Sequence, residues 1–187
     1  MLDELKQYAK AYAIPIICDD GLLFLKNTID KYQVKNVLEI GTAIGYSAIF
    51  MAEQGCFVTT FERNEKMITE AKKNIIKYKN QIELVCEDAL EYEGDLKTYD
   101  MIFIDAAKAQ YQKFFEKFIP YLNEGGIVVC DNLNFHHLDP SKVNRNTRQL
   151  MNKIEQFKTY LRNHQGFETI FYDDGDGMSI TKKAEKR

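Results

Sequence analysis

The sequence has 187 residues, of which 45% are hydrophobic and 12% aromatic, so it can form one globular domain spanning residues 1–187. Its formal net charge of −3 excludes a chain held to nucleic acid by overall charge, so any such partner needs a local basic patch. The four cysteines form no C-x-x-C pair and no apolar run approaches the roughly 18 residues of a membrane span, which indicates a cytoplasmic protein with reduced thiols.

Short apolar runs alternate with amphipathic stretches along the chain. We expect strands at 36–40, 57–61, 82–86, 101–105 and 127–131, and helices at 47–54, 65–79, 109–122 and 141–165. Near the C-terminus, two further apolar runs, 167–173 and 177–183, are joined by the turn sequence DGDG, which predicts a hairpin. This order is typical of the α/β class, with a mostly parallel sheet and helices on both faces.

A glycine turn, in the sequence VLEIGTAIGYSAI, follows the first expected strand. Gly41 and Gly45 let the backbone pass close to a ligand and present amide groups at a helix N-terminus. Glu39 stands two residues before Gly41, where it can accept hydrogen bonds from an ammonium group. Glu62 ends the second strand, at a distance typical of an acid that binds ribose hydroxyls. The turn is neither G-x-G-x-x-G nor a Walker loop, so alone it is weak evidence for a cofactor.

Polar side chains end the fourth and fifth expected strands. Asp105 ends MIFID, Asp131 ends IVVCD, and Asn132 follows directly. Because the C-terminal ends of parallel strands border the ligand crevice of such a sheet, we expect these three side chains to converge. An oxygen-only set without Cys or His favours a hard cation such as Mg²⁺. The alternative is the ordinary polar rim of a crevice.

Together these motifs resemble the class I S-adenosylmethionine-dependent methyltransferases, specifically the metal-dependent O-methyltransferases of the catechol and caffeoyl-CoA type. The resemblance runs from about Ile14 to the C-terminus and rests on LEIGTAIGYSAI, FERNE, IFIDAAKAQYQKFF, VVCDN and GDGMSITKK, which keep the family's order and spacing. It implies a Rossmann-like class I methyltransferase fold, with a mostly parallel seven-stranded sheet and a C-terminal antiparallel hairpin. Within the family, the sequence is most similar to the bacterial tRNA 5-hydroxyuridine methyltransferases.

The resemblance also implies the ligands and their contacts, with S-adenosyl-L-methionine (SAM) as methyl donor and Mg²⁺ as metal. The cofactor contacts fall on Ile17, Ser47, Glu62, Asp88, Ala89 and Asp105, and the glycine turn adds Glu39 and Gly41. The metal ligands fall on Asp105, Asp131 and Asn132, and a lysine that acts as general base falls on Lys108. Asp105 and Lys108 are therefore the expected catalytic residues. Without the resemblance, Lys108 reads as a surface lysine at a helix start.

The acceptor is not fixed by the chemistry, because catechols and 5-hydroxyuridine both offer two neighbouring oxygens. The cations of SKVNRNTRQLMNK and of the tail TKKAEKR would suit phosphate contacts: Lys142, Arg145, Arg148, Lys153 and four more in the tail. Phe135, His136 and His137 lie on a loop that could stack on an extruded base.

The resemblance, more than these residues, points to tRNA as partner. The expected reaction methylates 5-hydroxyuridine at wobble position 34 of the anticodon loop, giving 5-methoxyuridine. A catechol-like small-molecule O-methyltransferase and a non-catalytic RNA-binding module stay open as alternatives. The family also implies a homodimer.

Overall fold

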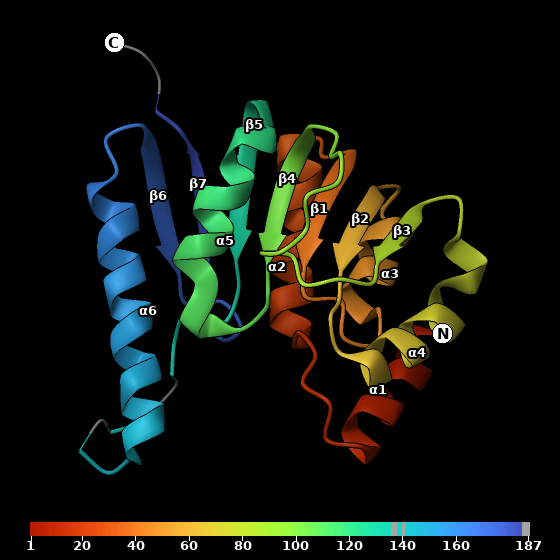
Figure 1. Ribbon diagram of the computed structural model, residues 1–187, viewed down its shortest axis with the longest axis horizontal. Coiled ribbons are helices and arrows are strands. Elements are labelled where there is room, and N and C mark those ends of the chain that lie inside the picture. The colour runs from red at the N-terminus through yellow and green to blue at the C-terminus, as the bar shows by residue number, and fades with distance from the viewer. Residues whose placement is uncertain (136–137, 140, 185–187) are drawn as a thin grey trace.

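Seven strands form one sheet in the computed structural model, which describes residues 1–135, 138–139 and 141–184 (Figure 1). The strand order is β3-β2-β1-β4-β5-β7-β6. The strands are β1 (Asn36–Ile40), β2 (Phe57–Phe61), β3 (Ile82–Val85), β4 (Tyr99–Ile104), β5 (Leu122–Cys130), β6 (Phe167–Tyr172) and β7 (Met178–Lys183). β7 runs antiparallel to β5 and β6, while the other pairings are parallel. The predicted mostly parallel sheet with a C-terminal antiparallel hairpin is confirmed.

Helices cover both faces of the sheet (Figure 1). They are α1 (Leu2–Ala11), α2 (Asp19–Tyr32), α3 (Tyr46–Glu53), α4 (Glu65–Asn74), α5 (Tyr111–Phe118) and α6 (Arg145–Asn163), with 3-10 turns η1 (Ile75–Tyr78), η2 (Lys108–Gln110) and η3 (Ile119–Tyr121). In the part of the chain that the structure describes, no helix is both long and apolar enough to cross a membrane.

Two hydrophobic cores result from the alternation of side chains along the central strands. On β4, Met101 and Phe103 join the core beneath α1, α2 and α3, while Ile102 and Ile104 join the core beneath α5 and α6. α5 forms because its buried aromatic residues recur at helical spacing, at positions 111, 114, 115 and 118. Both faces of β4 are therefore buried, which explains its continuous apolar run.

The strand order reverses direction between β1 and β4. From β1 the chain builds outward through β2 to β3, and from β4 it builds the other way to β5. In an open parallel sheet, this switch point opens a crevice at the C-terminal ends of the strands. The loops after β1, β2, β3, β4 and β5 all leave the sheet at that edge.

Candidate active site

The glycine turn after β1 is held between the ends of β2 and β4. The amides of Gly41 and Thr42 both donate to the carbonyl oxygen of Phe61, at 3.1 Å. Gly41 has a φ of +107°, and a β-carbon added there would overlap the carbonyl oxygen of Asp105. Only glycine fits both the close approach and the dihedral angle, so this turn leaves open backbone at the crevice.

Glu39 lies beneath the turn with no exposed surface. Its carboxylate accepts the hydroxyl protons of Ser47 and Thr60, each at 2.5 Å. Burial raises the pKa of Glu39 to about 7, although the two hydroxyls work against that shift. Because Ser47 lines the crevice and Glu39 does not, the structure places Glu39 as a support for the turn, and its predicted contact with the cofactor stays a prediction.

A cavity of about 460 Å³ occupies the crevice, a size typical of small-molecule sites. Most of the predicted site residues line this one cavity: Ile17, Gly41, Ser47, Glu62, Asp88, Ala89, Asp105, Lys108 and Asn132. Residues from the ends of several strands and from the segment before α2 are therefore brought together.

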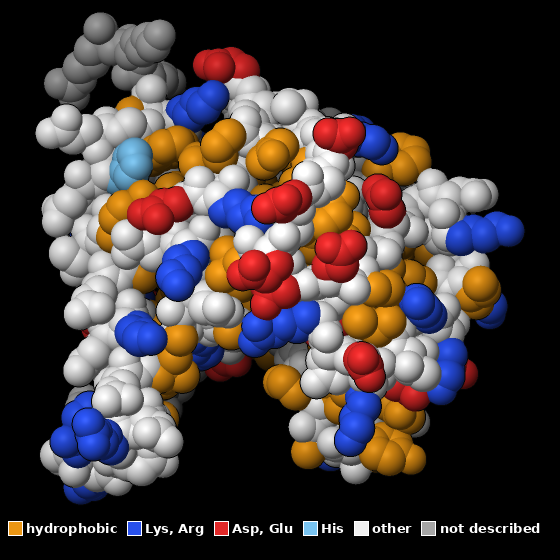
Figure 2. All heavy atoms as spheres, viewed as in Figure 1, with side chains coloured by type: hydrophobic (Ala, Val, Ile, Leu, Met, Phe, Trp, Pro, Cys, Tyr) orange, Lys and Arg blue, Asp and Glu red, His pale blue; other side chains and the backbone are white. Residues whose placement is uncertain are grey.

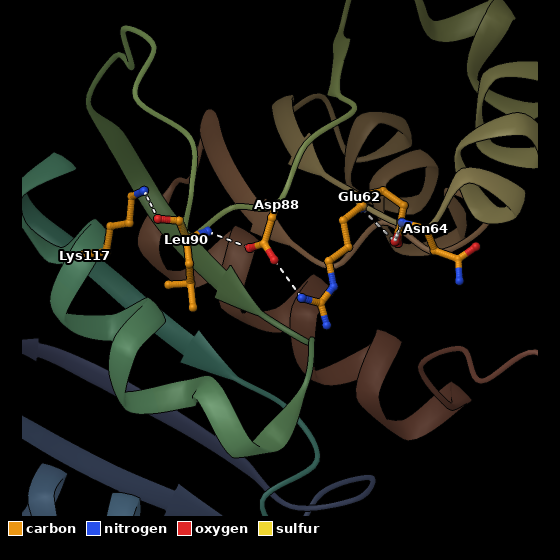
Figure 3. A network of polar contacts seen from close by, with 6 residues as sticks. Glu62, Asn64, Asp88, Leu90 and Lys117 are labelled. Carbon is orange, nitrogen blue, oxygen red and sulfur yellow. Dashed lines mark hydrogen bonds and ion pairs between the residues drawn. The ribbon is translucent and has the colours of Figure 1, made fainter.

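One side of the cavity carries Glu62 and Asp88 (Figure 3). The Glu62 carboxylate accepts hydrogen bonds from the amides of Ala43 at 2.8 Å, Arg63 at 2.9 Å and Asn64 at 2.8 Å. It is therefore a fixed anion between the glycine turn and α4. Partial burial favours protonation of Asp88, but the Leu90 amide and the Arg63 guanidinium outweigh it and hold the pKa of Asp88 below its usual value.

The other side of the cavity carries Asp105 and Asn132 of the predicted metal set, and the third member, Asp131, is buried beside them. Asp105 and Asp131 follow β4 and β5, whose ends are joined by the Asp131 amide donating to the Ile104 carbonyl at 3.1 Å. The Asn132 side-chain amide donates to Asp105 at 2.9 Å, and the Asn132 backbone amide donates to the Asp131 carboxylate at 2.6 Å. Asp105, Asp131 and Asn132 thus converge as the sequence predicts.

Burial and mutual repulsion disfavour charge on this carboxylate pair. Burial is the larger cause, and it raises the pKa values of both Asp105 and Asp131, with the Asp105 charge adding to the shift at Asp131. A nearby cation would relieve that cost, and the oxygen donors suit Mg²⁺. Among the described residues, no group of three or more His, Cys, Asp or Glu side chains is placed to hold a metal ion. The predicted set is of another kind, with two carboxylates and one amide. The set fits a hard cation, and the metal itself stays a prediction.

Lys108 begins η2 and faces the same cavity. Its ammonium nitrogen lies 4.7 Å from the centroid of the Phe135 ring. Burial lowers the pKa of Lys108 below its usual value, although Asp176, Asp105 and Asp131 oppose the shift. A lysine that loses its proton more readily is what a general base requires.

Asp176 is a site residue that the sequence did not reveal. It lies in the turn between β6 and β7, lines the cavity, and interacts electrostatically with Asp105, Asp131 and Lys108. Its carbonyl oxygen accepts the Asn134 amide at 2.8 Å, which fixes the turn against the loop after β5. The sequence DGDG signals only a turn, and the position of Asp176 depends on β7 pairing with β5.

The predicted basic residues that the structure describes do not line the cavity, and they fall into two groups. Lys142 precedes α6 and the next three predicted cations lie in its first half, whereas Lys182 and Lys183 belong to β7, and Lys186 and Arg187 fall outside the described residues. Lys142, Arg145, Arg148 and Lys153 are all exposed. Figure 2 shows Lys and Arg side chains gathered at the lower end of α6, with the surface hollowed between that end and α1. Phe135 lies beside Lys108, whereas His136 and His137 fall outside the described residues.

Comparison with known proteins gives one matching family and several similar solved structures. A family model described as O-methyltransferase matches residues 1–184. A Staphylococcus aureus protein provisionally named a caffeoyl-CoA O-methyltransferase has a crystal structure that matches with a TM-score of 0.91 at 41% identity, over 98% of this chain and 92% of that one. The methyltransferase PaMTH1 of Podospora anserina, bound to S-adenosylhomocysteine (SAH), shares the fold with a TM-score of 0.86 at 22% identity, over 98% and 88% of the two chains.

Curated sequences match this chain either over a shorter stretch at higher identity or over most of its length at lower identity. The catechol O-methyltransferase of Niastella koreensis is 32% identical over 120 residues, which are 59% of this chain and 54% of the relative. The caffeoyl-CoA O-methyltransferase of Populus kitakamiensis is 24% identical over 200 residues, covering 95% of this chain and 82% of the relative. The match therefore spans about half the length of the first relative and most of the second.

Proposed function

Because this chain belongs to the O-methyltransferase family, we propose that it transfers a methyl group from SAM to a hydroxyl oxygen of an acceptor. The observation that carries this proposal is one cavity with two differently equipped sides. Glu62 and Asp88 lie on one side, and Asp105, Asn132 and Lys108 lie on the other. The first side offers acceptors for ribose and adenine groups, and the second offers oxygen donors and a base.

Different residues of the cavity would bind the ligands and transfer the proton. The exposed backbone of the glycine turn and Glu62 would hold the adenosine part of SAM, leaving its sulfonium directed at the second side of the cavity. A divalent cation held by Asp105, Asp131 and Asn132 would supply positive charge that lowers the pKa of the acceptor hydroxyl. Neutral Lys108 would take the hydroxyl proton on its side-chain nitrogen, and the oxygen would then attack the methyl carbon in line with the sulfur. The methyl–sulfur bond would break with its electron pair staying on sulfur, so that SAH leaves.

We propose 5-hydroxyuridine at the tRNA wobble position as the acceptor. The exposed cations at the lower end of α6 border a hollow in the surface, and they would suit phosphate groups on either side of an extruded base. A catechol-like small molecule is the second candidate, which the names of the catechol and caffeoyl-CoA relatives favour.

The test supplies both acceptors under the same conditions. Undermodified tRNA from a strain that lacks this gene is incubated with the protein, SAM and Mg²⁺, and its nucleosides are analysed by mass spectrometry. 5-Methoxyuridine should form, and it should be lost with EDTA. Turnover of catechol or caffeoyl-CoA without any tRNA product would favour the second candidate. SAM-dependent turnover on none of them, with tRNA binding intact, would favour a non-catalytic RNA-binding module.

The basic surface of α6 gives a second discriminating measurement. Replacing Arg145, Arg148 and Lys153 with Gln together should raise KM for tRNA while leaving turnover of a small acceptor unchanged, because those side chains would touch only phosphates. An unchanged KM for tRNA would argue against this surface.

We also infer a homodimer, as the family resemblance implies, and a cytoplasmic location, which the scattered cysteines favour. β6 is an edge strand, and Ile170 in its centre is 54% exposed, so this edge has apolar surface available for a second copy. Sedimentation velocity at two protein concentrations would detect the dimer, and a monomer at both would contradict it.

A further inference from the structure

An ion pair crosses the mouth of the cavity between the ends of β2 and β3. The Arg63 guanidinium nitrogen Nη1 lies 2.6 Å from Asp88 Oδ2. Both residues line the cavity, and the Arg63 side chain is 58% exposed. An exposed ion pair adds little to the stability of a fold. The ion pair is therefore of interest because both of its residues line the cavity, and not because of its contribution to the free energy of unfolding.

The loop that carries Asp88 has apolar contacts of its own, because three of its side chains are partly buried against the core beneath α5 and α6: Leu90, Tyr92 and Leu96. Between Cys86 and Thr98, Ala89 is the one buried residue. Within the loop, Asp88 Oδ1 accepts the Leu90 amide at 2.9 Å, and the Asp88 carbonyl accepts the amides of Glu91 and Tyr92 at 3.0 Å. The shape of the loop is thus set locally, while apolar packing and polar contacts to other elements together place it against the cavity.

Lys117 of α5 supplies such contacts from the side opposite Arg63. Its ammonium donates to the carbonyl oxygen of Leu90 at 2.6 Å (Figure 3). It also donates to the carbonyl oxygen of Tyr92 at 2.7 Å. Hydrogen bonds from a charged donor are stronger than neutral ones, and two on one partly buried ammonium fix the loop in two directions. Figure 3 shows Asp88 and Leu90 between Lys117 on one side and Glu62 and Asn64, the neighbours of Arg63 in the chain, on the other.

We propose that Arg63 and Lys117 are positioning residues for the purine end of the methyl donor, and that they set its selectivity for adenine. This inference rests on the proposed SAM-dependent function. Asp88 and Ala89 border the cavity where the resemblance places adenine. A base is discriminated by atoms that must be held in place, and here Arg63 and Lys117 hold the loop on which those atoms lie.

Binding of SAH and of its analogue S-inosylhomocysteine, in which hypoxanthine replaces adenine, tests the proposal by calorimetry. Lys117→Met keeps the side-chain volume and removes the two donors. It should weaken SAH binding roughly tenfold and change binding of the analogue less than about twofold, so the preference for adenine falls. Arg63→Gln should act in the same direction.

Two control variants separate positioning from a general structural effect. Lys117→Arg retains the charge and donors and should restore most of the preference. Lys113→Met alters an exposed lysine on the same helix that has no partner among the described residues, and it should leave both affinities unchanged.

Equal weakening of both ligands, or an unchanged preference in both Lys117→Met and Arg63→Gln, would overturn the inference. If the unaltered protein bound no SAH, the proposed function itself would fail, which is a different result. Acceptor identity does not enter this experiment.

Discussion

Individual carboxyl groups set the chemistry at the second side of the cavity. Asp105 and Asp131 are pressed together by the ends of β4 and β5, and Asp176 approaches both from the β6–β7 turn. Tyr111 adds a further constraint, because its buried hydroxyl donates to the Asp131 carbonyl at 2.9 Å. These contacts fix the backbone of both residues, and a cation bound between the two carboxylates would offset their repulsion.

Asp131→Ala should abolish methyl transfer while leaving SAH affinity within about twofold, because Asp131 lies on the metal side and does not line the cavity that would hold the cofactor. Turnover and SAH binding by calorimetry are measured on the same preparation. Asp30→Ala, an exposed aspartate on α2, is the matched control and should leave both unchanged. Equal loss of turnover and SAH affinity in Asp131→Ala would show that the metal set is misplaced.

Lys108 predicts a pH dependence of the rate. Because burial lowers its pKa below the usual 10.5, the rate of the unaltered protein should rise with pH within a range below that value, as the neutral amine forms. Lys108→Arg keeps the positive charge but cannot act as a base, so it should lose turnover by ~10²–10⁴ and lose this rise. A Lys108→Arg variant with a normal rate and pH profile would rule out the base.

The glycine turn is the element on which cofactor binding depends. Gly41→Ala should lower the free energy of unfolding by about 2–4 kcal/mol, from strained φ and overlap with Asp105, and should abolish SAH binding. Gly55→Ala is the matched control, since Gly55 also has a positive φ, of +86°, but an added β-carbon meets nothing within 4 Å. It should cost about 1 kcal/mol and leave SAH binding intact. Urea unfolding and calorimetry measure the two effects, and similar losses in both variants would contradict this explanation.

Strand bounds follow from the sequence where a strand is buried at every position after its first residue. β1 and β2 begin and end as expected, at 36–40 and 57–61, because their apolar runs coincide with their pairing. β5 was expected from residue 127 but begins at Leu122, which pairs with Tyr99 across an irregular stretch. Polar, exposed residues can extend a ladder, and apolar periodicity does not detect them.

Helix starts depend on caps, which periodicity locates less well. The helix expected from residue 141 begins at Arg145, because the Asn144 side chain accepts the Thr147 amide at 2.9 Å and caps it there. The helix expected at 109–122 is shorter, α5 at Tyr111–Phe118, with 3-10 turns on either side. The N-terminal helices α1 and α2 were not among the expected elements.

The same logic separates the site residues that the sequence revealed from those it did not. Asp105, Asp131 and Asn132 could be foreseen because parallel strands end at one edge of a sheet. Asp176, Arg63 and Lys117 could not, since their places depend on the antiparallel position of β7 and on side-chain reach between distant elements. Residues at strand ends are predictable from order alone, whereas contacts between loops require the packed fold.

Buried acid groups couple the site to the stability of the whole molecule. In the folded protein, burial raises the pKa of Glu39 to about 7, from an ordinary value of 4.5. The folded state therefore binds more protons than the unfolded state between these values, and stability falls as pH rises through them. The contribution of Glu39 is fully present below about pH 4.5 and is lost as pH passes about 7.

Glu39→Gln mimics the protonated group and should flatten this dependence. A difference of about 2.5 pKa units corresponds to roughly 3 kcal/mol, so between pH 5 and pH 8 the unaltered protein should lose up to ~3 kcal/mol more than the variant. Urea unfolding at constant ionic strength measures the stability of the unaltered protein and of the variant. EDTA is present in order to remove any cation from Asp105 and Asp131. Glu168→Gln, an exposed glutamate on β6, should leave the pH dependence unchanged. If Glu39→Gln kept the full pH dependence, Asp105 and Asp131 would be its source. The pKa of Glu39 would then be no higher in the folded protein than in the unfolded chain.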